Sequence, residues 1–228
     1  MEKMQNLMMK RYKMFAGIGL IIVLIAFILS IYSADATATF FSVDKVTREA
    51  ASAGTEIVAA NVTRNVLPHW VPAFKFVGLG LMLGAITMAL GLIVTTLRGM
   101  GMNLMSLWPK ELNPGAPEKP RAAKLFPMLM IMGWMLLLIG FIAALASNGT
   151  VSAYWANSIS VVLNPAEAGS IHLDRLALIT GIKPWLGALR FAGMALLFTA
   201  ITVALTVIIR TLQAQEKSLR GFIQARTA

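Results

Sequence analysis

Few residues in this chain of 228 could take part in chemistry. It contains two histidines, His69 and His172, and no cysteine. Disulfides, thiolate-bound zinc, iron–sulfur clusters and thiol nucleophiles are therefore excluded. The histidines could join a carboxylate such as Asp44 or Glu49 around a metal ion, but no spaced set of ligands accompanies them. We expect no catalytic residue, no cofactor and no metal.

Two cofactor motifs can be tested against the sequence. A transmembrane b-type haem needs axial ligands inside a helix bundle, usually histidines, and both histidines lie outside the apolar runs described below. The segment from Gly78 to Gly84 has glycines spaced as in a nucleotide-binding loop, but no strand precedes it, so the match is spurious. A pocket of aromatic residues for a quinone or pigment stays open as an alternative.

Two cations are the polar feature of most interest. Lys75 and Arg190 each lie five residues after a tryptophan, Trp70 and Trp185 respectively. In the simpler interpretation their aliphatic stems lie in the apolar zone of a membrane while the charges reach the headgroups. In the functional interpretation they grip an anionic lipid, an acidic loop of a partner, or an anionic substrate.

The elements that hold these residues are membrane spans. Hydrophobic residues make up 57% of the chain and charged residues 13%, whereas about a quarter of a soluble domain is charged. Each of four apolar runs is long enough to cross about 30 Å of hydrocarbon as a helix. These runs cover roughly residues 15–33, 71–97, 126–146 and 187–209. We therefore predict an all-α integral membrane protein with four transmembrane helices.

The net charge of +10 is unevenly distributed along the chain. Basic residues are in excess in the N-terminal segment, in the proline-containing 98–124 linker and in a helical tail after Arg210, while the other two connections are nearly balanced. By the positive-inside rule, both termini and the linker are cytoplasmic and the other two loops are external. We expect a multi-pass protein of a bacterial or archaeal inner membrane, with anionic phospholipids rather than nucleic acid as the partner of these charges.

The second half of the chain repeats the first. A shift of 115 residues aligns thirteen identical residues of 70–97 with 185–212, and a shift of 114 aligns the first span with the third more weakly. The predicted domains are residues 1–114 and 115–228, each with two spans. Since both begin in the cytoplasm, we predict two parallel repeats related by a pseudo-twofold axis along the membrane normal.

Small residues indicate which helix faces meet, because helices in a bilayer associate through close backbone approach. Each span has such a stripe: Gly19, Ala26 and Ser30 in the first, Gly80, Gly84, Thr87 and Gly91 in the second, Gly133, Gly140 and Ala144 in the third, and Ala195, Thr199, Thr202 and Thr206 in the fourth. We interpret the stripes as a packed four-helix core. The alternative is that the Gly80/Gly84 face binds another subunit.

Both external loops carry helical patterns. From Asp44, which is placed as a helix cap, to Asn65, apolar residues follow one side of a helix that is interrupted near Gly54. The loop from Asn164 to Ile182 is comparable, so both loops are predicted to be partly helical. An outer belt of aromatic residues is predicted beside them: Phe40, Phe41, Trp70, Tyr154, Trp155 and Trp185.

Two function classes remain. The first is a non-catalytic accessory or structural subunit of a larger membrane complex, such as a respiratory complex or a membrane metalloenzyme. The second is a small transporter or channel with its pathway on the pseudo-twofold axis. Transport usually needs polar or ionisable residues at mid-membrane depth, where this chain offers threonines. We therefore favour the accessory subunit, with other membrane-protein subunits as partners. Tetraspanin and claudin patterns are excluded because they need external cysteines.

Overall fold

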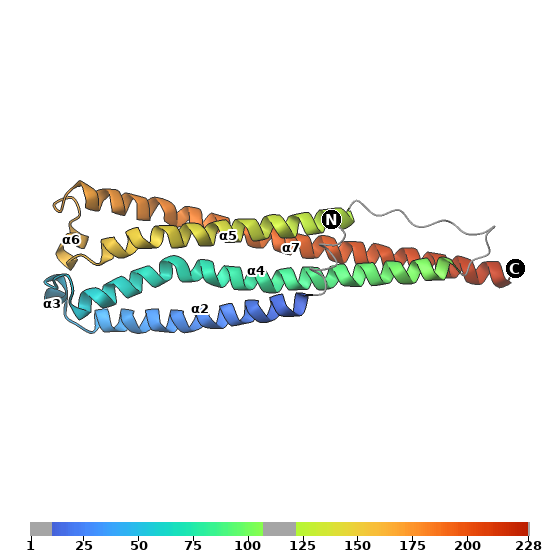
Figure 1. Cartoon of the computed structure of the whole chain (residues 1–228), viewed down its shortest axis with the longest axis horizontal. Helices are drawn as coiled ribbons and strands as arrows, with labels where there is room; N and C mark the ends of the chain where they lie inside the picture. The colour runs from blue at the N-terminus through green and yellow to red at the C-terminus, as the bar shows by residue number, and fades with distance from the viewer. Residues whose placement is uncertain (1–10, 107–121, 228) are drawn as a thin grey trace. The chain divides into compact units, whose positions relative to one another are not determined.

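The computed structural model describes residues 11–106 and 122–227, whose regular structure is entirely helical. Figure 1 shows two short helices, α3 (Lys45–Glu49) and α6 (Ile159–Leu163). The four long helices are α2 (Tyr12–Phe41), α4 (Glu56–Met105), α5 (Ala122–Trp155) and α7 (Ser170–Thr227). Each long helix contains a segment that is apolar and long enough to cross a membrane. An all-α chain with four such helices is therefore confirmed.

Two of the helices are much longer than a membrane crossing requires. α4 has 50 residues and α7 has 58, whereas about 20 residues span the hydrocarbon. Both therefore continue past the predicted spans 71–97 and 187–209 at each end. Helix α7 runs through the predicted helical tail after Arg210. Residues 1–10 and the prolines of the predicted linker lie outside the described residues.

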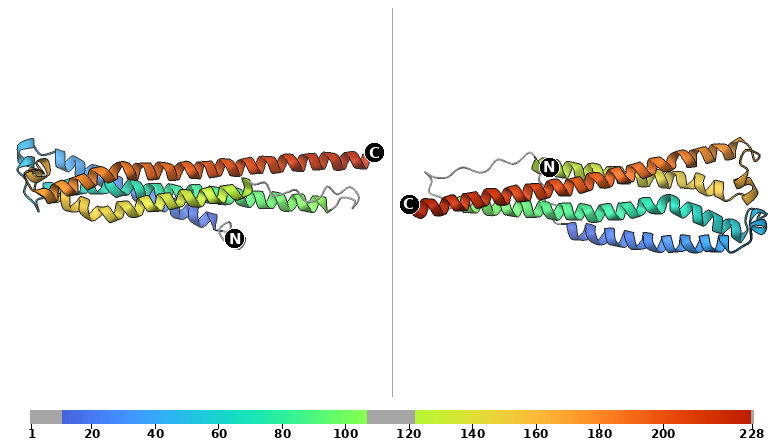
Figure 2. Two further views of the ribbon diagram at one scale, coloured as in Figure 1. Left: turned by 90° about the horizontal axis from the view of Figure 1, so that it is seen from above. Right: turned by 180° about the vertical axis from the view of Figure 1, so that it is seen from behind.

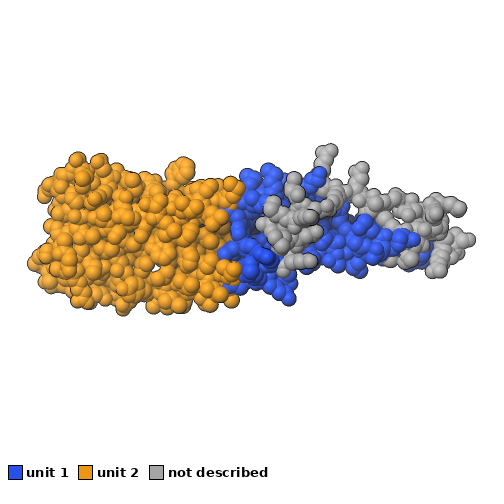
Figure 3. Space-filling model, in the orientation of Figure 1, with its two compact units in different colours: residues 1–17, 81–134, 195–228 blue, residues 18–80, 135–194 orange. Residues whose placement is uncertain are grey.

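The chain divides into two compact units, which Figure 3 shows in different colours. We call residues 18–80 and 135–194 the loop unit, because both predicted external loops belong to it. We call residues 1–17, 81–134 and 195–228 the tail unit. Each long helix contributes to both units, and each unit has its own packing.

In the loop unit, apolar side chains from both halves of the sequence pack together. One cluster lies at the loops and contains Phe40, Ala51, Val58, Ala60 and Ile159. A second joins α4, α5 and α7 and contains Ala73, Ala144 and Leu186. The backbone N–H of Ile159 donates to the carbonyl of Ala51 at 3.2 Å. Helices α3 and α6 therefore lie side by side, as Figures 1 and 2 also show.

The two loops are built alike. Helices α2 and α5 end 114 residues apart, and α3 and α6 begin 114 residues apart. A glycine with positive φ then precedes the next long helix, Gly54 at 86° and Gly169 at 105°, a conformation that other residues avoid. The side chain of Asp44 caps α3 by accepting from the backbone N–H of Thr47 at 3.0 Å. The predicted cap and the predicted break near Gly54 are confirmed.

In the tail unit, contacts of glycines and one tryptophan join the helices. A Cβ added to Gly84 of α4 would lie 2.6 Å from Nε1 of Trp134 of α5. The same indole ring lies 5.5 Å from the ring of Phe15 of α2, between centroids. The side-chain amide of Gln215 of α7 donates to the carbonyl of Leu97 of α4. Three helices therefore meet at Trp134 in this unit, and α7 is joined to α4.

Three of the four small-residue stripes lie on inward faces. Gly80, Gly84, Thr87 and Gly91 of α4 are buried, as are Gly133 and Gly140 of α5. The buried residues of α5 recur alternately three and four residues apart: Met130, Gly133, Leu137, Gly140, Ala144, Ser147, Val151 and Tyr154. This heptad spacing is typical of helices packed at a small crossing angle.

The predicted stripe of the fourth span is wrong. Thr199 and Thr202 of α7 are exposed and Thr206 is partly exposed, whereas the buried face consists of Gly193, Leu197, Ala200, Ala204 and Val207. The stripe was inferred from the alignment with α4, which packs against α2 at Gly78 and against α5 at Gly84. A helix with two neighbours buries two faces. Under the 115-residue shift, the buried face of α7, which contains Gly193, aligns with the face of α4 that contains Gly78.

Candidate functional site at the loop ends of the helices

Buried polar side chains gather in the loop unit. Asn61, His69 and Ser147 are 1%, 6% and 8% exposed, respectively. Asn61 and His69 lie on the part of α4 that precedes the predicted span, and Ser147 follows the predicted third span. Buried polar groups need hydrogen bonds, because an unpaired one costs free energy. Their partners therefore indicate what the site can do.

His69 and Ser147 link α4 to α5. The Nε2 of His69 lies 2.7 Å from the Oγ of Ser147, and the same Oγ lies 2.8 Å from the carbonyl oxygen of Ala143. The hydroxyl also lies 3.2 Å from the carbonyl oxygen of Ala144, and which group donates between His69 and Ser147 depends on the tautomer of the imidazole. The pair is a direct polar link between α4 and α5.

Arg190 extends this contact to α7. Its Nη2 lies 3.5 Å from the backbone carbonyl oxygen of His69, a long and weak hydrogen bond. Its Nε is buried and has no partner among the described residues. Lys75, the equivalent residue in the sequence alignment, is half-buried and makes no hydrogen bond or ion pair within the described part of the chain. The two cations thus have different surroundings.

The two aligned tryptophans also differ in environment. Trp70 packs against the cluster of Ala73, Ala144 and Leu186, and its ring lies 5.9 Å from that of Phe74. Trp185 is 70% exposed. Trp70 therefore contributes to the core of the loop unit, while Trp185 is available to lipid or a partner.

Arginine side chains cover an aromatic pair at the end of α2. The guanidinium carbon of Arg64 lies 3.8 Å from the ring centroid of Phe40 and 4.8 Å from that of Phe41. Arg48 of α3 lies 5.1 Å and 4.9 Å from the same two centroids. The Nε of Arg64 donates to Oδ1 of Asn61 at 3.0 Å, which orients the guanidinium. The sequence alone does not predict this cluster.

One sequence signal could have drawn attention to Arg64. No acidic residue lies three or four positions from it on its helix, so it lacks the partner that surface arginines on helices often have. Its aromatic partners lie 24 and 23 residues earlier in the sequence, and no local pattern predicts that contact. Two residues of the predicted aromatic belt, Phe40 and Phe41, thus make cation–π contacts with Arg48 and Arg64.

The arrangement offers hydrogen-bond donors and guanidinium groups. Among the described residues, no three histidines, aspartates or glutamates are grouped so that they could hold a metal ion. The polar contacts join α4 to α5 and α7, and the two arginines present positive charge near the loops. The chemistry that this supports is the binding of anions and of other helices.

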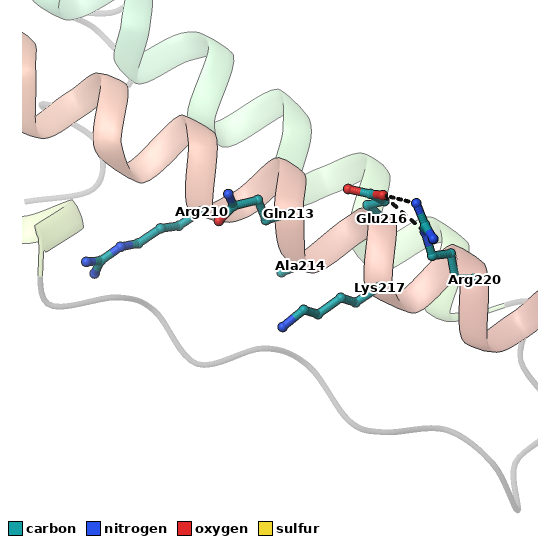
Figure 4. Close-up of a pocket in the computed structure, with 6 residues that line it drawn as sticks. All are labelled: Arg210, Gln213, Ala214, Glu216, Lys217 and Arg220. Atoms are coloured by element: carbon teal, nitrogen blue, oxygen red, sulfur yellow. Dashed lines mark hydrogen bonds and ion pairs between the residues drawn. The ribbon is translucent and has the colours of Figure 1, made fainter.

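The tail unit carries a second group of charges, on α7 beyond the predicted span. Figure 4 shows Arg210, Lys217 and Arg220 on this part of the helix. Nη2 of Arg220 pairs with Oε1 of Glu216 at 2.7 Å, which leaves Arg210 and Lys217 without an ion pair in the described part of the chain.

Comparison of the chain with protein-family models, with curated proteins and with solved structures finds no significant match.

Proposed function

We propose that this protein is a non-catalytic accessory subunit of a larger integral membrane complex. The observation that carries the proposal is an outward face of small residues on α7, comprising Ala195, Thr199 and Thr202, which are exposed in the isolated chain. Small residues allow another helix to approach closely, whereas a lipid-facing surface gains nothing from them. We infer that a helix of a partner subunit packs on this face.

The threonine hydroxyls in the spans support this proposal over a transport pathway. Those of Thr87, Thr199, Thr202 and Thr206 each donate to the carbonyl four residues earlier in their own helix, at 2.8–3.0 Å. Their protons are therefore satisfied within the helix and are not presented to a passing ion or solute. Because these hydroxyls already have partners, burying this face of α7 in an apolar interface costs little free energy of desolvation.

We further infer that the chain consists of two parallel repeats with both loops outside and both termini in the cytoplasm. The distribution of basic residues supports this orientation. The 114-residue spacing of the helix boundaries supports the repeat. Contact between α3 and α6 also supports it, since parallel repeats place both loops on one side of the membrane.

Anionic phospholipids are proposed as partners of the basic residues at the ends of the spans. Lys75 and Trp185 would meet headgroups on the outer side, as Arg210 and Lys217 would on the cytoplasmic side. Basic residues next to a span are attracted to anionic headgroups by roughly 1 kcal/mol each.

The test of the accessory-subunit proposal is recovery of the partner from the source membrane. The tagged chain, extracted in mild detergent, should migrate as a larger complex. Changing Thr199 and Thr202 to leucine overfills the proposed interface, and overpacking commonly costs about 1–3 kcal/mol. Recovery of the partner should then fall about tenfold or more, because each 1.4 kcal/mol corresponds to a factor of ten. The melting temperature of the isolated variant should not change, since neither residue is buried in the chain itself.

Leu205→Phe is the matched control, because it adds bulk to the exposed surface beside the stripe. It should retain the partner. A wild-type chain that migrates alone, and that conducts ions or solutes in reconstituted vesicles, would instead establish the transporter alternative.

A further inference from the structure

Arg48 and Arg64 form a pair of cations without a counter-ion. Both guanidinium carbons lie within 5.1 Å of the ring centroid of Phe40. The carboxylates nearest in sequence to Arg48 have other partners, since Asp44 accepts from Thr47 and Glu49 lies 3.7 Å from Lys45. No acidic side chain of the described residues lies within 4.0 Å of either guanidinium. Two like charges that contact the same ring, with no carboxylate beside them, favour the binding of an anion.

The cation–π contacts leave hydrogen-bond donors available. A guanidinium has five N–H donors, and a contact with an aromatic ring does not use them as hydrogen bonds. Arg64 commits its Nε–H to Asn61 and keeps its terminal N–H groups. Arg48 makes no side-chain hydrogen bond within the described residues. These groups can donate hydrogen bonds to the oxygens of a phosphate group.

The second loop shows that the fold does not require these arginines. The rings of Tyr154 and Trp155 meet edge to face at 5.1 Å and 86°, nearly as Phe40 and Phe41 do at 5.2 Å and 88°. No arginine covers this second pair within the described residues. The hydroxyl of Tyr154 instead donates to the carbonyl of Val162 at 3.1 Å, next to the end of α6. An edge-to-face aromatic pair therefore forms at the second loop without arginines, and the two arginines are specific to the first loop.

We propose that Arg48 and Arg64 form an anion site that binds a phosphate group at the loop ends of α2 and α4. The group comes either from a phospholipid headgroup or from a soluble phosphate. Phe40, Phe41 and Asn61 are positioning residues that hold the two guanidinium groups. The site lies on this chain alone, so it does not depend on the proposed partner subunit.

The test measures binding to the purified full-length protein in detergent. Native mass spectrometry records adducts of phosphatidylglycerol added to the protein, and a thermal-shift titration records the effect of inorganic phosphate. The Arg48→Gln/Arg64→Gln variant should weaken binding about tenfold or more, because charge-assisted contacts are strong. The control variant, Arg175→Gln/Lys183→Gln, removes two basic residues of α7 near the second loop and should stay within about twofold, since it leaves Phe40, Phe41, Arg48 and Arg64 intact.

Arg48→Gln alone is the second variant, because Arg48 makes no side-chain hydrogen bond in the described part of the chain and the variant removes only its cation–π contacts with Phe40 and Phe41. It should also weaken binding while the melting temperature without ligand changes little. Competition between inorganic phosphate and the lipid would identify a soluble phosphate as a possible ligand, whereas lipid binding without competition would identify a headgroup site. Equal binding of lipid and phosphate by the wild type and both arginine variants would overturn the proposal. So would loss of a co-purifying protein with phosphate and lipid binding unchanged, which would assign the arginines to a partner's carboxylates.

Discussion

At the scale of single residues, the hydrogen bond between His69 and Ser147 links two helices whose other contacts nearby are apolar. Ser147→Ala removes the hydroxyl partner of the buried imidazole, and loss of a buried hydrogen-bond partner commonly costs about 1–3 kcal/mol. We expect a lower free energy of unfolding in detergent, measured by denaturant titration. Ser30→Ala is the control, because the Ser30 hydroxyl donates only to the carbonyl of Ala26 in its own helix, at 2.7 Å. Equal losses in both variants would contradict a linking role for Ser147.

The lowered pKa of Asp44 predicts that the stability of the first loop depends on pH. Hydrogen bonds from the side chain and the backbone N–H of Thr47 hold the pKa of Asp44 below its usual range. A carboxylate with a lowered pKa stabilises the fold above its unfolded pKa of about 3.9, and this contribution is lost as the pH falls through the folded pKa. Amide exchange of residues 42–50 should therefore be slower in the wild type than in Asp44→Ala at pH 6, and this difference should shrink as the pH falls through the folded pKa of Asp44.

Asp44→Asn is the control for this loop, because asparagine caps helices without a charge. Its protection relative to Asp44→Ala should not change with pH. A wild-type advantage over Asp44→Ala that does not shrink as the pH falls would show that ionisation of Asp44 does not contribute.

At the scale of elements, Gly78 decides how closely α2 and α4 approach. A Cβ at this position would lie 2.9 Å from the backbone oxygen of Gly19 and 2.8 Å from Cγ2 of Ile22. Because a backbone atom cannot rotate away, Gly78→Ala should separate the two helices at a cost of about 1–3 kcal/mol. The melting temperature of the purified protein should fall.

Gly187→Ala is the matched control within α7. Nothing lies within 4 Å of the Cβ that it would add, and alanine favours a helix over glycine by about 1 kcal/mol. This variant should be neutral or more stable. If Gly78→Ala melts at the same temperature as Gly187→Ala, the close approach of α2 and α4 does not contribute to stability.

At the scale of the whole molecule, the proposed orientation can be tested directly because the chain has no cysteine. An impermeant thiol reagent applied to intact cells should label Ser52→Cys and Ala168→Cys, one in each loop. It should not label Ser218→Cys in α7, nor Ala116→Cys, a position outside the described residues. The physical reason is that basic segments stay in the cytoplasm. Labelling of one loop without the other would exclude parallel repeats, and labelling at Ser218 would reverse the orientation.

The sequence by itself determined the features that depend on local chemistry. Four apolar helices follow because a backbone in hydrocarbon must satisfy its own hydrogen bonds. The cap at Asp44 and the break at Gly54 follow from residues within a few positions of each other. The absence of cysteine excludes disulfides, thiolate-bound metals and thiol nucleophiles, because these need a cysteine side chain.

The tertiary structure alone decided which faces and which distant residues meet. Lipid and protein interior are both apolar, so hydrophobicity does not reveal which face of a membrane helix is buried. The sequence therefore predicts a buried position for Thr199 and Thr202, which are exposed on α7. The contacts of Arg64 with Phe40 and of His69 with Ser147 depend on the rotation and register of helices that are far apart in sequence, and no local pattern of residues encodes either quantity.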